Sequence, residues 1–481
     1  MCDTQAEGAM NGWHAEEAVN GWHAEEAVNG WHAEEAVNGW HAEEVVNGRQ
    51  ADKAIDRQQL EEVNETPQKT YRSLITESHV KKALKSQQGS SAQLLSWTVT
   101  DFTDRGDNYA CVVTSVDVRY HKEGKDRKTS FVVKCNPCRV LPFFNGFSTI
   151  IFQKEAGYYL ELLPLLNVQL SHVGREPIRA PHCYFAHITE KEEVIFLEDL
   201  RQEGFKMFDR MKGMDKAHAV LVLKELGKLH AASILYQKEA SIVLEDKYTY
   251  IQKDFHSMLG GDDFKKMLSS QAQNAAEIAE RIVGYKKVAD WLKDFAPSSM
   301  DVFVEQIKRS PPFDVLCHGD CWNNNILFKY DETGVPVDVR LLDFQISRKA
   351  SPATDLNYFM YTSFNGPERK DNLETFLNVY YESLREVLEA GGTKAEFTSQ
   401  ELREEYHKKN LFGLIMAMMV VPVVVSQAAD VIDLDNTTEG EHETFVEYLR
   451  EKMLKQLDSN PLLRPRFISI FDEMLEYGVI S

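Results

Sequence analysis

The sequence lacks three features that would narrow its class at once: a basic charge excess, an apolar run near its start, and a cysteine framework. Its 54 Lys and Arg stand against 75 Asp and Glu, for a formal net charge of −21. General binders of nucleic acid or of anionic membranes carry the opposite charge, so we expect neither partner. Met1 leads into polar residues without the apolar run of a signal peptide, and seven cysteines are spread over 481 residues. We therefore expect a cytoplasmic protein with reduced thiols.

Long hydrophobic runs are also scarce. One segment, residues 411–429 (LFGLIMAMMVVPVVVSQAA), has no charged residue over 19 positions, which is close to the length that spans a bilayer. It contains Pro422 and is followed at once by Asp430. We expect a buried helix that is broken or kinked at the proline, and no membrane span.

The chain does have enough apolar sequence for a large core. Hydrophobic residues make up 43% and charged residues 27%, as in ordinary globular proteins, which excludes wholesale disorder and small disulfide scaffolds. The negative charge is uneven, because residues 1–48 hold ten acids and no Lys or Arg. The rest of the chain is therefore only mildly acidic.

A nine-residue repeat fills the beginning of the sequence. The unit NGWHAEEAV starts at Asn11 and recurs from Asn20, Asn29 and Asn38, with a decayed fifth copy from Asn47. A period of nine puts successive tryptophans on alternate faces of either a helix or a strand, so no apolar stripe forms. We expect residues 1–66 to be a disordered tail and linker. The alternative, a metal site, would use the four evenly spaced histidines His14, His23, His32 and His41.

Three segments rich in Val, Thr and aromatic residues predict strands at 97–103, 110–121 and 130–135. The turn DRGDN at 104–108 joins the first two, and Lys134 lies in the third. In a nucleotide-binding lid, backbone N–H groups of such a turn cover the phosphates and the lysine neutralises them. The plainer alternative is a simple hairpin and a solvent-facing lysine.

The next two segments extend this pattern. Apolar residues at helical spacing predict a helix over 147–163, and its Glu155 could hold Lys134 in place or be an exposed helical acid. Residues 193–200 (EVIFLEDL) predict a buried strand that runs into a polar linker with Gly204. In a two-lobed kinase this linker offers backbone groups to adenine.

The residues suited to chemistry concentrate in 315–344. A short strand ends in His318-Gly-Asp320, a loop reaches Asn325, and a returning strand ends in Asp343. Phosphoryl transfer needs a carboxylate to accept the proton of the attacking hydroxyl, and hard oxygen ligands for Mg²⁺. The D-x-x-x-x-N spacing lets one loop present Asp320 as the base and Asn325 as a metal ligand, with Asp343 as the second ligand. Two neighbours could substitute for Asn325, and the plain alternative is a structural hairpin with incidental acids.

Two further groups have ordinary explanations. His230 lies in an amphipathic helix predicted over 215–235, and we expect a hydrogen-bonded core histidine there. Cys135 and Cys138 have zinc-ligand spacing and could pair with Cys317 and Cys321. The second pair brackets His318-Gly-Asp320, where a closed zinc site would block chemistry, so we do not expect zinc.

These motifs resemble the ecdysteroid kinase-like family, within the wider aminoglycoside phosphotransferase and choline kinase group. The resemblance covers about residues 70–470. It implies an α+β, two-lobed protein-kinase-like fold, with a small β-rich lobe at 67–200 and a larger, mainly helical lobe at 201–481. It rests on LCHGDCWNNN at 316–325, LDFQ at 342–345, GDNY at 106–109, FVVK at 131–134, Glu155 before Tyr158, and FLEDL at 196–200.

Carried onto matching positions, the resemblance gives each residue a role. Asp320 would be the base, and Asn325 with Asp343 would bind Mg²⁺. Lys134, held by Glu155, would orient the phosphates of ATP. Asp355 matches a family acid that braces the catalytic loop, although a helix N-cap explains it equally well. The other nucleotide-binding residues would be two in the phosphate turn and two at the hinge: Gly106, Asn108, Glu198 and Leu200.

The resemblance implies a monomeric kinase that moves the γ-phosphate of ATP to a hydroxyl of a small molecule. The acceptor would be an ecdysteroid or another apolar hydroxylated compound, in hormone storage or detoxification. Two alternatives are a choline- or aminoglycoside-type kinase and a silent binding protein of the same fold. The turn continues as Tyr109-Ala-Cys111, where relatives often carry a small hydroxyl residue. We expect this difference to affect the rate of the reaction and not whether the reaction occurs. A protein kinase is disfavoured, because no Ala-Pro-Glu segment follows Asp343.

Overall fold

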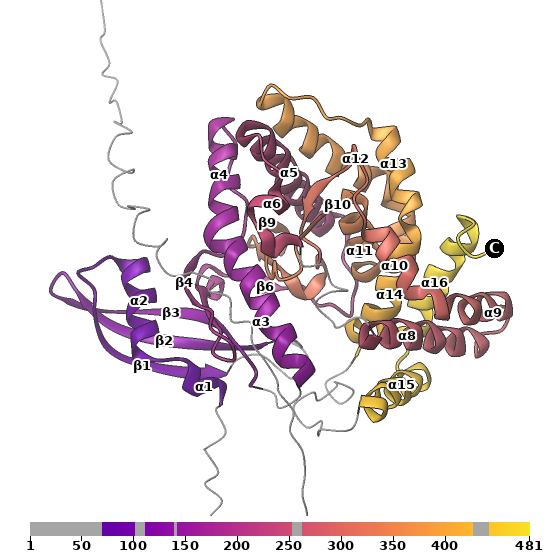
Figure 1. Ribbon diagram of the computed structural model, residues 1–481, viewed down its shortest axis with the longest axis horizontal. Helices are drawn as coiled ribbons and strands as arrows, with labels where there is room; N and C mark the ends of the chain where they lie inside the picture. The colour runs from indigo at the N-terminus through magenta and orange to yellow at the C-terminus, as the bar shows by residue number, and fades with distance from the viewer. Residues whose placement is uncertain (1–69, 102–110, 139–141, 253–261, 427–441) are drawn as a thin grey trace, which may run out of the picture. The chain divides into compact units, whose positions relative to one another are not determined.

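The fold is described from a computed structural model, which describes residues 70–101, 111–138, 142–252, 262–426 and 442–481 (Figure 1). Three of the features predicted above lie outside these residues: the nonapeptide repeat, Gly106 and Asn108. The described part divides into a β-rich region that runs to about residue 200 and a larger helical region after it.

Five antiparallel strands form the sheet of the first region, in the order β1-β2-β3-β5-β4. The predicted segments are present, but β1 and β3 begin earlier than expected, β2 nearly keeps its predicted bounds, and β5 is shorter than predicted. β2 and β3 pair as far as Lys122 and Lys125, so the turn is confined to Glu123 and Gly124, where we expected it to spread over 121–128. Both turn residues have positive φ (53° and 73°), the geometry that matches the twist of a tight hairpin. The strands are β1 (Gln93–Asp101), β2 (Val112–Lys122), β3 (Lys125–Cys135), β4 (Cys183–His187) and β5 (Val194–Glu198).

Helices cover this sheet. α2 (Glu77–Gln88) begins at Thr76, whose hydroxyl accepts a hydrogen bond from the backbone N–H of His79. Its buried residues Val80 and Leu84 pack into a core that includes Val116 and Phe131 of the sheet. The predicted helix at 147–163 is longer in both directions: α3 (Pro142–Gly157) runs through a π-helical turn (Tyr158–Leu162) into α4 (Leu163–His172).

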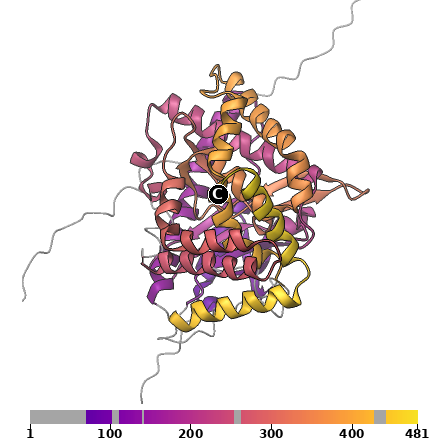
Figure 2. The same ribbon diagram turned by 90° about the vertical axis from the view of Figure 1, so that its right-hand side faces the viewer.

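The larger region is built around long helices. α5 (Lys216–Ala240) packs along α12 (Gly366–Ala390), and α11 (Pro352–Ser363) is buried along its whole length and packs against α14 (Asn410–Val424). Figure 2 looks onto the C-terminal helices, drawn in yellow. The remaining helices are α6 (Leu244–Lys247), α8 (Asp262–Glu280), α9 (Lys286–Phe295), α10 (Ser299–Ile307), α13 (Ser399–Lys408), α15 (His442–Ser459) and α16 (Leu463–Glu476).

Short strands of the larger region carry the loop at 318–325. β7 (Val315–Cys317) pairs with β10 (Arg348–Ala350), and β8 (Ile326–Tyr330) pairs with β9 (Pro336–Leu341) and with β6 (Lys206–Met207). A sheet-bearing small lobe and a helical large lobe make up the two-lobed α+β architecture, so the predicted fold class is confirmed.

Residues 411–424 of the apolar segment lie in α14, a mostly buried helix with Pro422 in its last turn, and residues 427–429 lie outside the described residues. Gly413 on this helix approaches Tyr361 so closely that an added Cβ would lie 2.4 Å from the ring. Among the described residues, no helix on its own has the length and apolarity to cross a membrane. The pair α13 and α14, bent by 53°, passes that test only when taken together.

Candidate active site

The loop between β7 and β8 is held by α11. Asp355 accepts hydrogen bonds from the backbone N–H groups of His318 and Gly319, at 2.7 and 2.9 Å. Gly319 has φ of 88°, and an added Cβ would lie 2.3 Å from the carbonyl oxygen of Ile346, so the position requires glycine. The N-cap of α11 is Ser351. Asp355 was expected either to brace the catalytic loop or to cap a helix. It is not the N-cap of α11, and it does contact the loop.

Asp355 belongs to a buried polar chain. It contacts His230 Nε2 at 3.1 Å, and His230 Nδ1 lies 2.8 Å from the hydroxyl of Tyr380. His230 is the hydrogen-bonded core histidine that its helix predicted. Burial alone would raise the pKa of Asp355, but the hydrogen bond and charge of His230 outweigh it and hold that pKa below its ordinary value. The carboxylate thus stays charged behind the loop.

Both carboxylate oxygens of Asp320 accept hydrogen bonds. The hydroxyl of Tyr358 donates to Oδ1 at 2.6 Å, and Nδ2 of Asn325 donates to Oδ2 at 2.9 Å. Burial and the nearby charge of Asp343 raise the pKa of Asp320 to about 6, whereas the bonds from Tyr358 and Asn325 oppose that rise. The group is still ionised at neutral pH.

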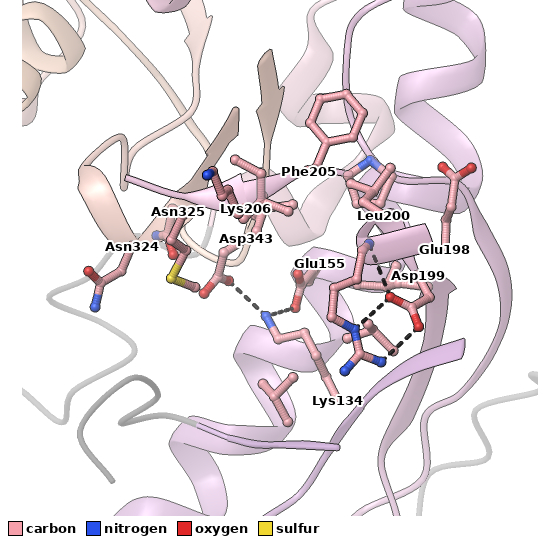
Figure 3. A pocket seen from close by; sticks show the side chains of 18 residues that line it. Lys134, Glu155, Glu198, Asp199, Leu200, Phe205, Lys206, Asn324, Asn325 and Asp343 are labelled. Carbon is pink, nitrogen blue, oxygen red and sulfur yellow. Dashed lines mark hydrogen bonds and ion pairs between the residues drawn. The ribbon is translucent and has the colours of Figure 1, made fainter. Parts of the chain in front are cut away.

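Lys134 joins the small lobe to the large one. Its Nζ lies 2.6 Å from Glu155 Oε2 on α3 and 2.9 Å from Asp343 Oδ1 (Figure 3). Burial disfavours the ammonium, but the charges of Asp343 and Glu155 outweigh it and raise the pKa of Lys134 well above its ordinary value. Gln345 donates to the second oxygen of Asp343 at 3.2 Å.

Asp343 is placed by an unusual backbone conformation and by its neighbour. Its φ is 66°, in the left-handed region that few residues other than glycine adopt. Phe344 stacks on Tyr158, with ring centroids 4.1 Å apart and planes at 6°, and lies 4.7 Å from the ring of His318. The segment after β9 is therefore anchored both to the helix that carries Glu155 and to the loop that carries Asp320.

A cavity of about 340 Å³ lies between the two lobes beside these groups (Figure 3). Its walls are mainly apolar and include Val132, Leu197 and Leu327. Such a slot fits a planar base at one end and leaves the charged groups for phosphates at the other. Six predicted site residues line it: Lys134, Glu155, Glu198, Leu200, Asn325 and Asp343.

The six predicted residues therefore lie around one cavity. Asp320 does not line this cavity itself but is hydrogen-bonded to Asn325, which does. Two contacts were not foreseen from the sequence, those of Tyr358 with Asp320 and of Gln345 with Asp343. Tyr358 follows Asp355 by three residues on one helix, a spacing that puts both on one face. That spacing could have revealed Tyr358, but nothing in the sequence pairs Gln345 with Asp343.

The thiols do not form the zinc set that we considered. Within the described residues, the one cluster with metal-ligand geometry is His230, Cys317 and Asp355. It has only one of the four cysteines, and its members bond to the protein itself. Burial raises the pKa of the Cys317 and Cys321 thiols, which disfavours the thiolate that zinc needs.

The profile of the ecdysteroid kinase-like family matches residues 105–393, more than half of the chain. The chain belongs to this family. A curated relative, the uncharacterized oxidoreductase dhs-27 of Caenorhabditis elegans, is 22% identical over 295 residues. The match covers 59% of this chain and 32% of that protein, so the chain spans about a third of the length of that relative.

Three solved kinases match the chain at 12–13% identity. An ethanolamine kinase of Plasmodium vivax has a TM-score of 0.33, covering 79% of this chain and 84% of its own. Choline kinase LicA of Streptococcus pneumoniae scores 0.34, with 80% and 99% covered, and a choline kinase of Cryptosporidium parvum scores 0.38, with 84% and 97% covered. Because these scores are low, the fold assignment rests on the sheet, the lobes and the family.

Proposed function

We propose that this protein is a small-molecule kinase that transfers the γ-phosphate of ATP to a hydroxyl group. The observation that carries the proposal is the link between two predicted metal ligands and a predicted base. The amide N–H of Asn325 donates a hydrogen bond to the carboxylate of Asp320. The carboxylate of Asp343 accepts a hydrogen bond from Nζ of Lys134. Lys134, Asn325 and Asp343 line one cavity, and Asp320 contacts Asn325, which supports a phosphoryl-transfer site here.

The donor set suits magnesium. Asn325 uses its amide N–H groups on Asp320, which leaves its amide oxygen available. Asp343 adds a carboxylate, and hard oxygen ligands of this kind are those that Mg²⁺ prefers. When bound, Mg²⁺ would neutralise charge on the β- and γ-phosphates. Asn325 and Asp343 would hold it.

The protein's own residues would then act as follows. Lys134, fixed by Glu155, orients the phosphates, and Glu198 and Leu200 lie where the base would enter. Gly106 and Asn108 would cover the phosphates from the lid. Asp320 accepts the proton of the acceptor hydroxyl. At the same time the oxygen of that hydroxyl forms a bond to the γ-phosphorus. The bond from that phosphorus to the β–γ bridging oxygen breaks, and ADP leaves.

Family membership supports an ecdysteroid-like or other apolar hydroxylated acceptor. We propose in addition that the enzyme is cytoplasmic and monomeric. A second candidate is a choline- or aminoglycoside-type kinase, whose cationic acceptor would need an acidic pocket. A third is a binding protein without turnover. The four intact groups Lys134, Asp320, Asn325 and Asp343 favour an active enzyme over this last candidate.

The test is γ-phosphate transfer from Mg-ATP to a panel of ecdysteroids, plant phenols, choline and aminoglycosides. Asp320→Asn should lose transfer, and Asp290→Asn, an exposed acid on α9, serves as the matched control. Transfer to a steroid or phenol that is lost only in Asp320→Asn is the expected result. Transfer confined to choline or aminoglycosides would show that the acceptor belongs to that cationic class. Equal activity in Asp320→Asn would show that Asp320 is not the base.

A further inference from the structure

One face of α11 presents two groups to the catalytic loop. Asp355 binds the backbone N–H groups of His318 and Gly319, and Tyr358, three residues further on, binds the carboxylate of Asp320. The helix therefore holds the backbone of the loop at one point and its reactive side chain at another. We propose that Tyr358 is a positioning residue, which fixes the orientation of the Asp320 carboxylate toward the acceptor hydroxyl.

The geometry accounts for the effect. A carboxylate with one hydrogen bond can still turn about its Cβ–Cγ bond. Asp320 has donors on both oxygens, Tyr358 at 2.6 Å and Asn325 at 2.9 Å, and these come from different elements. The side chain of Gln345 also bonds to Asp320. The plane of the carboxylate is thereby set, and a lone pair is left for the proton that arrives. Orientation of this kind is a large part of catalysis by positioning.

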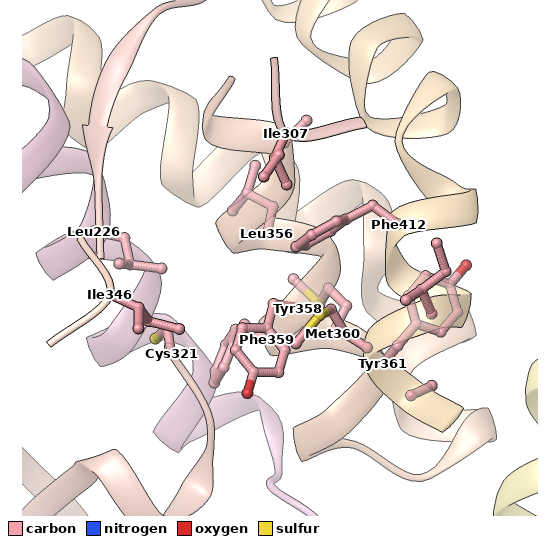
Figure 4. Packing of buried hydrophobic residues seen from close by; sticks show 14 of the residues in the cluster. Leu226, Ile307, Cys321, Ile346, Leu356, Tyr358, Phe359, Met360, Tyr361 and Phe412 are labelled. Atoms are coloured by element: carbon pink, nitrogen blue, oxygen red, sulfur yellow. The ribbon is translucent and has the colours of Figure 1, made fainter. Parts of the chain in front are cut away.

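Tyr358 is itself rigid. Its side chain is 3% exposed and belongs to the large buried cluster of the helical lobe (Figure 4). Within the described residues, Asp320 is the hydrogen-bond partner found for its hydroxyl. A donor locked by packing holds its acceptor more tightly than a side chain on a loop does. The contact therefore joins the base to the core and not only to its own loop.

The inference rests on the proposed function, since a base needs orienting only if it takes a proton. It makes a specific demand on kinetics. Replacing Tyr358 with Phe keeps the ring and removes one hydroxyl, and Tyr358 is not among the residues that line the nucleotide cavity. Nucleotide binding should persist while the chemical step slows.

The experiment compares Tyr358→Phe with Tyr361→Phe in the full chain. Tyr361 lies one turn further along α11 and is also buried, but its hydroxyl has no hydrogen-bond partner in the described part of the chain. For each variant, Mg-ADP affinity is measured by calorimetry. The kcat and KM for ATP are then measured with an ecdysteroid as acceptor and, separately, with water.

We expect Tyr358→Phe to lower kcat by about 10- to 100-fold, the scale of a misplaced catalytic group, at unchanged KM and Mg-ADP affinity. Tyr361→Phe should match the wild type. If Tyr358→Phe keeps full kcat, or loses affinity and kcat together, the positioning role is wrong while the proposed function stands. A wild-type protein that transfers phosphate neither to any acceptor of the panel nor to water would refute the proposed function, and this role with it.

Discussion

Phe344 lies flat on Tyr158, with ring centroids 4.1 Å apart and an angle of 6° between the planes. This stack connects two parts of the site that come from distant stretches of sequence. Tyr158 directly follows the helix that carries Glu155, and Phe344 follows Asp343. Because Lys134 bridges those two acids, the stack and the ion pairs hold the same helix in place.

Replacing Phe344 with Ala should therefore cost both stability and activity. Loss of a fully buried aromatic ring costs about 3–5 kcal/mol, and Asp343 would lose its neighbouring anchor. Urea denaturation and Mg-ADP calorimetry measure the two effects. Tyr158→Phe is the control, because it keeps the stack and removes a hydroxyl without a partner among the described residues. Unchanged Mg-ADP affinity in Phe344→Ala would show that the ring does not place Asp343.

Gly319→Ala tests whether the catalytic loop needs its glycine. The new Cβ would lie 2.3 Å from the carbonyl oxygen of Ile346, and φ is 88°. At Gly89, φ is 86° but nothing lies within 4 Å of an added Cβ. Gly89→Ala should cost about 1–3 kcal/mol from backbone strain alone, because φ of 86° with ψ of 170° is a conformation that essentially only glycine adopts, whereas Gly319→Ala should cost more and reduce kcat. Equal unfolding free energies for the two variants would contradict the close contact at Ile346.

Asp355→Asn should destabilise the loop at 318–320. The amide keeps one acceptor oxygen, so one of the two backbone N–H groups that Asp355 satisfies would face an N–H donor. A buried donor without a partner costs about 1–3 kcal/mol. Denaturation measures this loss, and hydrogen exchange should accelerate at one of the two amides, His318 or Gly319. Normal protection of both amides in the variant would contradict the two hydrogen bonds to Asp355.

A buried ion pair joins α12 to α16. Arg369 donates to Glu473 from two nitrogens, at distances of 2.6 to 3.1 Å, and both side chains are buried. Removing one partner leaves an unpaired buried charge, so Arg369→Met should cost about 3–5 kcal/mol. The neighbouring exposed pair of Lys370 with Glu476 is the control, and Lys370→Met should change little. Similar melting temperatures for the two variants would contradict this account.

The local parts of the site could be predicted from the sequence. Lys134 lies in a segment whose Val, Thr and aromatic residues predict a strand. Glu155 lies in a segment whose apolar residues recur at helical spacing. These two patterns predict the elements that carry the ion pair. The D-x-x-x-x-N spacing likewise predicted that one loop presents Asp320 and Asn325 together, and in the structure their side chains are hydrogen-bonded. Period and spacing are local properties, and a single sequence reports them.

Contacts that depend on how distant elements pack could not be predicted in this way. The spacing of Tyr358 from Asp355 puts both on one face of α11, but only the packing of that helix against the loop brings the Tyr358 hydroxyl to Asp320. Arg369 and Glu473 lie on helices 104 positions apart, and each alone resembles an ordinary surface charge. The tight β2–β3 turn was not predicted because it needs a positive φ at Glu123. Glutamate seldom adopts a positive φ, so the residue type gives no sign of the turn.

The most direct test of the central claim is magnesium-dependent nucleotide binding, which needs no knowledge of the acceptor. Calorimetry of Mg-ADP with the wild type, Lys134→Met and Asp343→Asn measures it, with Lys286→Met on α9 as the exposed control. We predict that the wild type and the control bind equally, and that Lys134→Met and Asp343→Asn lose about tenfold or more in affinity, as loss of a charged phosphate or metal contact implies. Equal affinity in all four proteins, or no binding by the wild type, would contradict a nucleotide site between the lobes.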